Sequence, residues 1–228
     1  IQPFDEDFLE AVRSMPEVQE ADARRNISAR VEVAPGEWKS ITLFVIADYN
    51  DIRVNKVSSE SGAWPPPERE ILIERAALPV IDAQVGDVIR VKMPSDTQRE
   101  MRIAGAAYDP AQLPAQLDST PYGYITFDTL EWLGEDYGFN ELHVIATHPE
   151  DKVWAQHVVN LVKDRAERSG YTIPLSMTAE PGMLPMDDIL QGILLLMGSL
   201  GVLSLFLSVF LVVNTVSALL AQQKRQIA

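Results

Sequence analysis

The sequence predicts an α+β protein: a mixed α/β domain interrupted by a small β-rich subdomain, then one long transmembrane α-helix. Three observations predict this order. Residues 189–220 contain no charged side chain over 32 positions. Before that run, segments with helical spacing of apolar residues alternate with segments of period two. Between two proline-containing stretches, several short strand-like segments interrupt the pattern. Helices and strands segregated in this way are typical of the α+β class.

The apolar run is long enough to cross a bilayer as a helix. About 20 residues suffice for a crossing, and as one helix the run extends roughly 48 Å, beyond the ~30 Å hydrocarbon core. The surplus must tilt or project from the membrane as a stalk. We therefore expect a linker at 177–188, a transmembrane helix with a stalk at 189–221, and the start of a cytoplasmic segment at 222–228.

The charges beside the run predict its direction. Lys224 and Arg225 follow it, whereas Asp187 and Asp188 precede it. Basic flanks stay cytoplasmic, which places residues 1–188 outside the cytoplasm. Export of a soluble region of that size needs an earlier hydrophobic segment. We therefore expect a transmembrane helix upstream of this sequence, and we expect the chain to be a fragment.

Small and polar residues form one stripe on the predicted membrane helix. At about 100° per residue, four of them fall within about 60° of one another, with Asn214 to one side. Small side chains let helices approach closely in lipid, and an amide at this depth bonds to a neighbouring helix. We expect helix packing, with a polar group on a transport path as the alternative. The stripe consists of Gly201, Ser204, Ser208 and Thr215.

The region before the linker begins with a helix and a hairpin. Asp5 to Met15 has helical spacing, and the period-two strand Ala21–Val33 follows, with Arg24 among its outward polar residues. A Pro-Gly turn leads to a return strand at Trp38–Ala47. With the later helices and strands, these segments form a porter-like α/β part at 1–49 and 119–176. The later segments are expected at 127–136 (helix), 142–147 (strand), 150–169 (helix) and 171–175 (strand).

A series of short strand-like segments occupies residues 50–118. Three compact segments read as strands, and the alternation of Ile89, Val91 and Met93 with basic residues is typical of one. Prolines at 110, 114 and 121 indicate a linker that leaves this part. We expect a separately packed, β-rich inserted subdomain here. Its strands are predicted at 70–74, 87–93 and 99–105.

Composition and motifs give no support to an enzyme. Residues 1–188 carry 33 acidic and 17 basic side chains, a net charge of −16 that repels nucleic acid. The chain has no cysteine, no phosphate-binding glycine motif, no GxSxG and no HExxH. His143, His148 and His157 are expected to be ordinary surface or half-buried residues. We assign no catalytic, cofactor-binding or metal-binding residue.

The apolar run ends with the polar pair Asn214-Thr215, and the basic segment Arg225-Gln226-Ile227-Ala228 closes the sequence. This arrangement, after an outer domain, resembles the FtsX-like permeases of ABC transporters with a MacB-like periplasmic core domain. In that family the helix after the core domain ends in an Asn-Thr-type pair and a basic segment. Asn214-Thr215 and Arg225-Gln226-Ile227-Ala228 occupy those places, with Gln226 and Ala228 replacing the usual acid and glycine. Further matches follow the family's order along the chain: Gly62-Ala63-Trp64-Pro65, Ile71-Leu72-Ile73, Val85-Gly86-Asp87-Val88-Ile89, Ile103-Ala104-Gly105 and Tyr122-Gly123-Tyr124-Ile125.

The resemblance implies an architecture and a set of partners. Family members are multi-pass proteins of the cytoplasmic membrane, with the core domain between the first two of four helices. They form homodimers or heterodimers and work with nucleotide-binding subunits, which hold ATP and Mg²⁺; this chain would hold neither. Adaptor or substrate proteins outside the membrane are further implied partners. Lys224, Arg225, Gln226 and Ile227 would begin the segment that contacts the ATPase.

Three functions remain open from the sequence. The first is a permease that couples ATP hydrolysis to export or extraction of a lipid, lipoprotein, peptide or drug. The second is a non-transporting regulator that activates a cell-wall hydrolase or senses an antibiotic by the same motion. The third, independent of the resemblance, is a single-span adhesion or receptor-like protein. Two further hydrophobic segments of about 20 residues downstream would exclude the third.

Overall fold

The computed structural model describes residues 3–178 and 187–227; of residues 118, 187–189 and 218–227 it describes the backbone only. Contacts within the chain divide it into two units, Ile1–Met183 and Leu184–Ala228, and each is described by itself. The elements in chain order are α1 (Glu6–Arg13), β1 (Val18–Ala34), β2 (Glu37–Val45), β3 (Ser58–Gly62), β4 (Glu70–Glu74), β5 (Val88–Lys92), β6 (Gln98–Tyr108), α2 (Ala115–Asp118), β7 (Tyr122–Ile125), α3 (Phe127–Trp132), β8 (Glu141–Ala146), α4 (Lys152–Arg168) and α5 (Asp187–Ile227).

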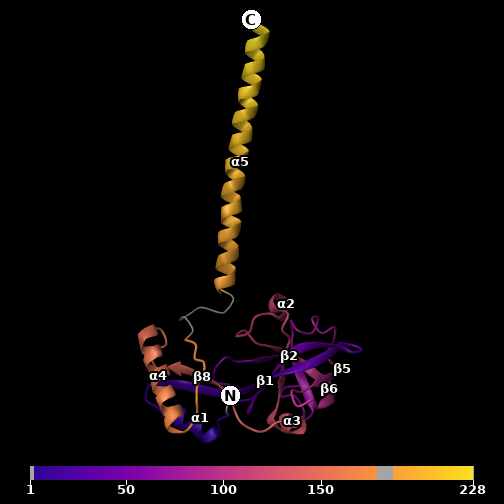
Figure 1. The fold of residues 1–228 in the computed structure, drawn as a ribbon, viewed down its shortest axis with the longest axis vertical. Helices are drawn as coiled ribbons and strands as arrows, with labels where there is room; N and C mark the ends of the chain where they lie inside the picture. The colour runs from indigo at the N-terminus through magenta and orange to yellow at the C-terminus, as the bar shows by residue number, and fades with distance from the viewer. Residues whose placement is uncertain (1–2, 179–186, 228) are drawn as a thin grey trace. The chain divides into compact units, whose positions relative to one another are not determined.

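The strands of the N-terminal unit form a mixed sheet that closes on itself (Figure 1). β1 pairs with β2, β2 with β7, β7 with β4, β4 with β6, β6 with β5, and β5 returns to β1. The interior of this barrel is filled by aliphatic side chains, as expected for a small barrel. They come from every strand of the ring and include Val31, Leu43, Ile73, Val91, Ile103 and Ile125.

A layer of two strands and two helices lies at the N-terminal end of β1, outside the barrel. There β1 pairs with β8, and α1 and α4 pack on this two-stranded ribbon. Each helix begins at a capping aspartate. The side chain of Asp5 accepts a hydrogen bond from the N–H of Phe8, and that of Asp151 accepts from the N–H of Val153. Figure 1 shows α1, α4 and β8 at one side of the unit and β2, β5 and β6 at the other. We call α1, α4 and β8 the helical layer, and we keep the name barrel for the closed ring of β1, β2, β7, β4, β6 and β5.

β1 is a 17-residue strand that belongs to both parts. Residues 18–24 pair with β8, and residues 25–34 pair with β2. The hairpin to β2 turns at Gly36, whose φ of 78° suits glycine, and the side chain of Glu32 accepts a hydrogen bond from the Gly36 N–H. One continuous strand therefore joins the barrel to the helical layer.

The predicted fold class is confirmed: the sheet is mixed, helices accompany it, and a long apolar helix follows. The strand pairing does not follow the expected boundaries at 49/50 and 118/119, however. β2 and β7, assigned to the porter-like part, pair with each other and enclose the same core as β4, β5 and β6. The strands of residues 50–118 pair with one another through β6, but β5 also pairs with β1 and β4 with β7, so the sheet continues across both expected boundaries.

Other local predictions also differ from the structure. The segment 171–175, predicted as a strand, has no strand pairing. β3 and the short helix α2 were not predicted, since the SSESG sequence of β3 has no apolar alternation. Of the linker predicted at 177–188, residues 179–186 lie outside the described residues, and α5 begins at Asp187.

Candidate functional site

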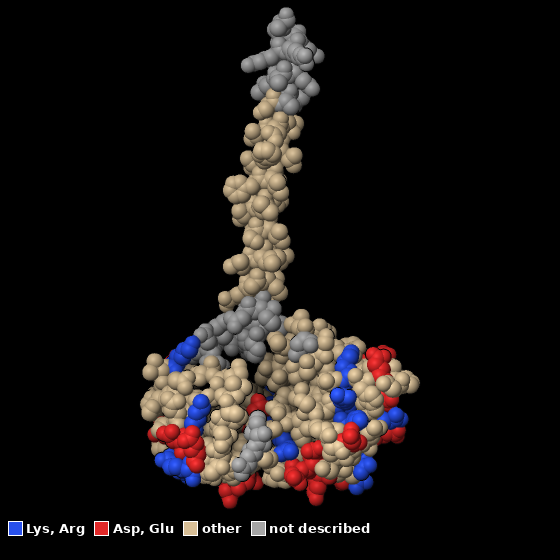
Figure 2. All heavy atoms as spheres, viewed as in Figure 1, with Lys and Arg blue, Asp and Glu red and all other residues tan. Residues whose placement is uncertain are grey.

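One helix among the described residues is long and apolar enough to cross a membrane. Leu190–Ser217 spans 28 residues with a mean hydropathy of 2.4, and no residue of its most apolar stretch is buried within the chain. Figure 2 shows charged side chains scattered over the N-terminal unit and none along the described side chains of α5. An unburied apolar helix of this length is stable when lipid or another protein covers it.

The predicted packing residues all lie on α5 with exposed side chains. Apart from its chain neighbours and the backbone of its own helix, no atom lies within 4 Å of the position that a Cβ on Gly201 would occupy. The Thr215 hydroxyl donates to the carbonyl of Leu211 at 2.8 Å, which satisfies it within the helix. A neighbour for the stripe stays a prediction. The backbone of Lys224, Arg225, Gln226 and Ile227 continues α5, and their side chains lie outside the described residues.

The two ends of the N-terminal unit meet in one aromatic cluster. Phe4, before α1, and Tyr171, after α4, have ring centroids 6.3 Å apart. Phe8 lies 5.4 Å from Phe4 and 5.2 Å from Tyr171, and Phe139 lies 5.7 Å from Phe4. Such contacts stabilise beyond the area that they bury. We call these four residues the end cluster; it fixes the incoming and outgoing chain to the helical layer.

The outgoing chain stays on the helical layer after Tyr171. Ile173 packs against the same core as the end cluster. The hydroxyl of Thr178 donates to the side-chain oxygen of Gln156 on α4 at 3.4 Å. Both chain connections of the unit therefore attach to the helical layer, and the barrel joins that layer through β1.

A buried arginine lies where β1 changes partners. Arg24 is 1% exposed and is the last residue of β1 that pairs with β8. Its Nη2 donates to the carbonyl oxygens of Val54, at 2.8 Å, and of Asn55. Its Nη1 lies 3.9 Å from Oδ2 of Asp109 at the end of β6. The Tyr124 hydroxyl donates to the same oxygen at 2.9 Å. We call these five residues the Arg24 network; through the Arg24 side chain it joins β1, where its partners change, to the loop after β2 and to the end of β6.

Burial sets the ionisation of this network. Burial raises the pKa of Asp109, opposed by hydrogen bonds from the Ala111 N–H and the Tyr124 hydroxyl and by the charge of Arg24. Burial and the neighbouring Asp109 raise the pKa of Tyr124 well above its ordinary value. Burial also raises the pKa of Glu74, whose carboxylate accepts from the Ala76 N–H. Asp109 and Glu74 are therefore desolvated carboxylates held by specific hydrogen-bond donors.

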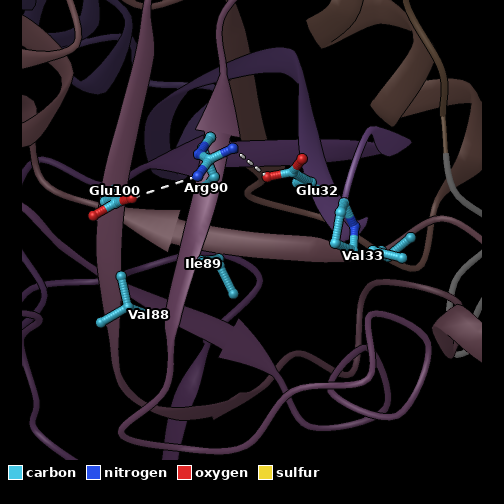
Figure 3. A pocket seen from close by; sticks show the side chains of 8 residues that line it. Glu32, Val33, Val88, Ile89, Arg90 and Glu100 are labelled. Atoms are coloured by element: carbon cyan, nitrogen blue, oxygen red, sulfur yellow. Dashed lines mark ion pairs between the residues drawn. The ribbon is translucent and has the colours of Figure 1, made fainter.

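Two open hollows lie on the barrel. The first has a volume of about 290 Å³ and forms where β1 and β5 part after a short pairing. Arg90 lies there between two carboxylates, with its Nη1 2.7 Å from Oε2 of Glu32 and its Nη2 3.6 Å from Oε1 of Glu100. Figure 3 shows both ion pairs, with the side chains of Val88 and Ile89 on the neighbouring part of β5. The second, of about 280 Å³, lies beside Tyr49 and Trp64. Among the described residues, no three His, Asp or Glu side chains are grouped as metal ligands would be.

Sequence reasoning missed the end cluster and the Arg24 network. The alternation in β1 placed Arg24 with outward polar residues, yet the loop 48–57 and the end of β6 cover it. Phe4 and Tyr171 could have been noticed only as aromatic residues beside predicted helix ends. The sequence gives no sign that these ends meet.

Comparisons with known proteins give structural likenesses only. No protein-family model matches the chain, and no curated protein matches it. One similar solved structure is the extracellular domain of the noncanonical ABC-type transporter YknZ from Gram-positive bacteria: 15% identity, TM-score 0.49, covering 75% of this chain and 86% of that one. Another is the periplasmic region of MacB from Actinobacillus actinomycetemcomitans: 13% identity, TM-score 0.47, covering 75% and 77%. These likenesses concern the fold.

Proposed function

We propose that the chain belongs to the permease subunit of an ABC transporter, which couples cytoplasmic ATP hydrolysis to movement of the N-terminal unit. That movement would export or extract a lipid, lipoprotein, peptide or drug. The observation that carries the proposal is α5: an unburied, uncharged span of 28 residues that follows a folded acidic unit. Asn214, Thr215 and the basic residues after the span, in the order of the resembled family, support this function.

The proposal includes an orientation and partners. Lys224 and Arg225 lie in the cytoplasm and residues 1–188 outside it, by the charge asymmetry about the span. The full-length protein is a multi-pass protein of the cytoplasmic membrane that pairs with a second permease. A nucleotide-binding subunit carries ATP and Mg²⁺ and contacts the segment that begins at Lys224.

The contacts of the N-terminal unit support transmission of motion. Displacement of the chain at Thr178 acts on α4, because Thr178 bonds to Gln156 and Tyr171 packs in the end cluster. α4 and β8 share one core with β1, and β1 continues into the barrel. Packed rigid elements of this kind can carry a displacement between distant parts. The Arg24 network resists bending of β1 at the point where its partners change.

The test uses the full-length protein with its nucleotide-binding subunit in nanodiscs. Gly201→Leu and Ser208→Leu should displace a neighbouring helix, cost about 1–3 kcal/mol by overpacking, and uncouple ATP hydrolysis from movement of the N-terminal unit. Phe206→Leu, on the opposite face of α5, is the matched control and should be nearly silent. Movement is measured as a distance change between spin labels on introduced cysteines, since the chain has none.

Two results would count against the proposal. A full-length protein that binds no nucleotide-binding subunit would refute the function itself. A Phe206→Leu variant as damaged as Gly201→Leu would refute the packing role of the stripe. Intact coupling without substrate movement would instead favour the non-transporting regulator.

A further inference from the structure

The two-stranded ribbon of β1 and β8 has an apolar face and a polar face. Side chains alternate along a strand, and residues directly opposite on two strands share a face. On the polar face, Asp22 lies across from His143. Arg24 lies across from Glu141 on the same face. The ribbon therefore turns a polar surface away from α1 and α4, and polar contacts between parts of one chain permit relative movement. The apolar face, which packs in the core of the helical layer, consists of Ala21, Ala23, Leu142 and Val144.

The segment 48–57, between β2 and β3, bonds to this polar face; we call it the strap. Two of its carbonyls belong to the Arg24 network. In addition, Nδ2 of Asn55 lies 3.0 Å from Nδ1 of His143 on β8. Nη1 of Arg53 lies 3.9 Å from Oε2 of Glu20 on β1. The strap is thus joined to the ribbon by polar contacts, and those of Asn55 and Arg53 are exposed to solvent.

The strap is anchored to the barrel by apolar side chains. Tyr49, Ile52 and Val57 are buried in one core with side chains of β2, β4 and β7. The Tyr49 hydroxyl donates to the carbonyl of Ile125 at 3.0 Å, and its ring centroid lies 5.0 Å from that of Trp64. Buried apolar area stabilises more than exposed polar pairs do. If the helical layer tilts away from the barrel, the strap therefore stays with the barrel and parts from the ribbon.

The bonds at the junction itself form a pivot. The Asn26 N–H donates to the side-chain oxygen of Asn140, and Nδ2 of Asn140 donates to the Asn26 carbonyl, both at 2.8 Å. These bonds lie where β1 passes from β8 to β2, so a tilt of the helical layer moves them least. Glu20 and His143 lie further along the ribbon and move more. Their contacts with the strap therefore open before the junction does.

We propose that the strap is a releasable latch between the helical layer and the barrel, with the Asn26–Asn140 pair as its pivot. When the latch is closed, it holds the angle of β1, and a displaced helical layer carries the barrel with it. When it is open, β1 bends at the junction and the helical layer swings alone, as in hinge motions at the ends of elements. This role in coupling rests on the proposed function, whereas the latch itself is a property of the N-terminal unit.

Distances between spin labels test the latch in residues 1–228 in nanodiscs. Labels on Asp164→Cys in α4 and Ser40→Cys in β2 report the angle, since both positions are exposed and the chain has no cysteine. Asn55→Gly removes the amide that bonds to His143 and keeps the local backbone, because glycine readily adopts the φ of 51° found there. A second distance should appear, with a population roughly two- to tenfold above that in the unsubstituted protein, as loss of one hydrogen bond implies.

Two further variants make the result decisive. Asn50→Gly is the matched control: it places a glycine in the same strap but removes no bond to the ribbon among the described residues, so the distances should stay unchanged. His143→Leu removes the same bond from the β8 side and should give the same second distance as Asn55→Gly. Urea unfolding identifies the variants that are folded. A folded Asn55→Gly or His143→Leu protein with the distances of Asn50→Gly would overturn the latch.

The full-length protein with its nucleotide-binding subunit tests the role in coupling. Labels are placed on Ser199→Cys in α5 and on either Ser40→Cys or Asp164→Cys. In the Asn55→Gly protein, the ATP-driven distance change should shrink at Ser40 and persist at Asp164. An undiminished change at Ser40 would overturn the coupling role. Failure of the nucleotide-binding subunit to bind would count against the proposed function instead, and the distances in residues 1–228 do not depend on that subunit.

Discussion

Replacing Arg24 by methionine should be the most damaging single change to the junction between the two parts. Methionine keeps much of the side-chain volume but leaves the carbonyls of Val54 and Asn55 without their guanidinium donor. It also leaves Asp109 buried without its cation. Breaking a buried charged pair costs about 3–5 kcal/mol. The lower end applies, since Asp109 keeps donors from Tyr124 and the Ala111 N–H and lies 3.9 Å from Nη1 of Arg24. We expect a loss of about 3 kcal/mol.

The assay is urea unfolding and thermal unfolding of the N-terminal unit, both followed by tryptophan fluorescence and circular dichroism. For a unit of this size, 3 kcal/mol corresponds to a fall of about 6–12 °C in melting temperature. Arg30→Met is the control: Arg30 lies exposed on the same strand, and surface changes stay within about 0.5 kcal/mol. Adding Asp109→Asn should recover part of the loss, with a coupling of about 0.5–3 kcal/mol.

Two outcomes would refute this reasoning. A loss below about 1 kcal/mol for Arg24→Met would mean that the network carries little net stability. Strict additivity of Arg24→Met and Asp109→Asn would mean that the two residues do not interact.

Two further predictions concern pH and autonomy of folding. Burial raises the pKa of Asp109 above 3.8, so the folded protein binds this proton more tightly than the unfolded chain. The free energy of unfolding of the wild-type protein should therefore rise, relative to that of Asp109→Asn, as the pH falls from neutral through the raised pKa, and the gain should be complete below pH 3.8. If urea unfolding at a series of pH values gave a constant difference between the two proteins, the pKa shift would be contradicted. A fragment of residues 50–118 should show no cooperative unfolding, because in it β5 has lost its partner β1 and β4 its partner β7. Residues 3–178 should unfold cooperatively. A cooperative transition in the short fragment would support the expected inserted subdomain.

The segments with strong periodicity could be predicted from sequence. α5 follows from length and lack of charge alone, and β4, β5 and β6 lie within two or three residues of their expected ranges. These predictions succeed because a spanning helix or a buried strand imposes its own local pattern. The pairings that cross the expected boundaries, β1 with β5 and β4 with β7, could not be predicted, because local patterns do not encode which strands pair.

The sites were harder to predict than the strands. The alternation of apolar and polar residues in β1 assigns each residue to one of two strand faces, and we took the polar face to be exposed to solvent. Arg24 lies on such a face, yet the loop after β2 covers it, so its burial depends on tertiary packing. The same holds for Phe4 and Tyr171, whose contact joins residues 167 positions apart. The stripe on α5 was read from a helical wheel, and its neighbour stays a prediction.

The sharing of β1 between the barrel and the helical layer limits how this protein could be recombined. No cut in the chain leaves both parts whole, because the residues before Arg24 complete one sheet and those after it complete the other. A graft of the barrel from a relative would have to bring β1 with it and would then replace the strand beneath α1. The two parts are therefore expected to diverge together.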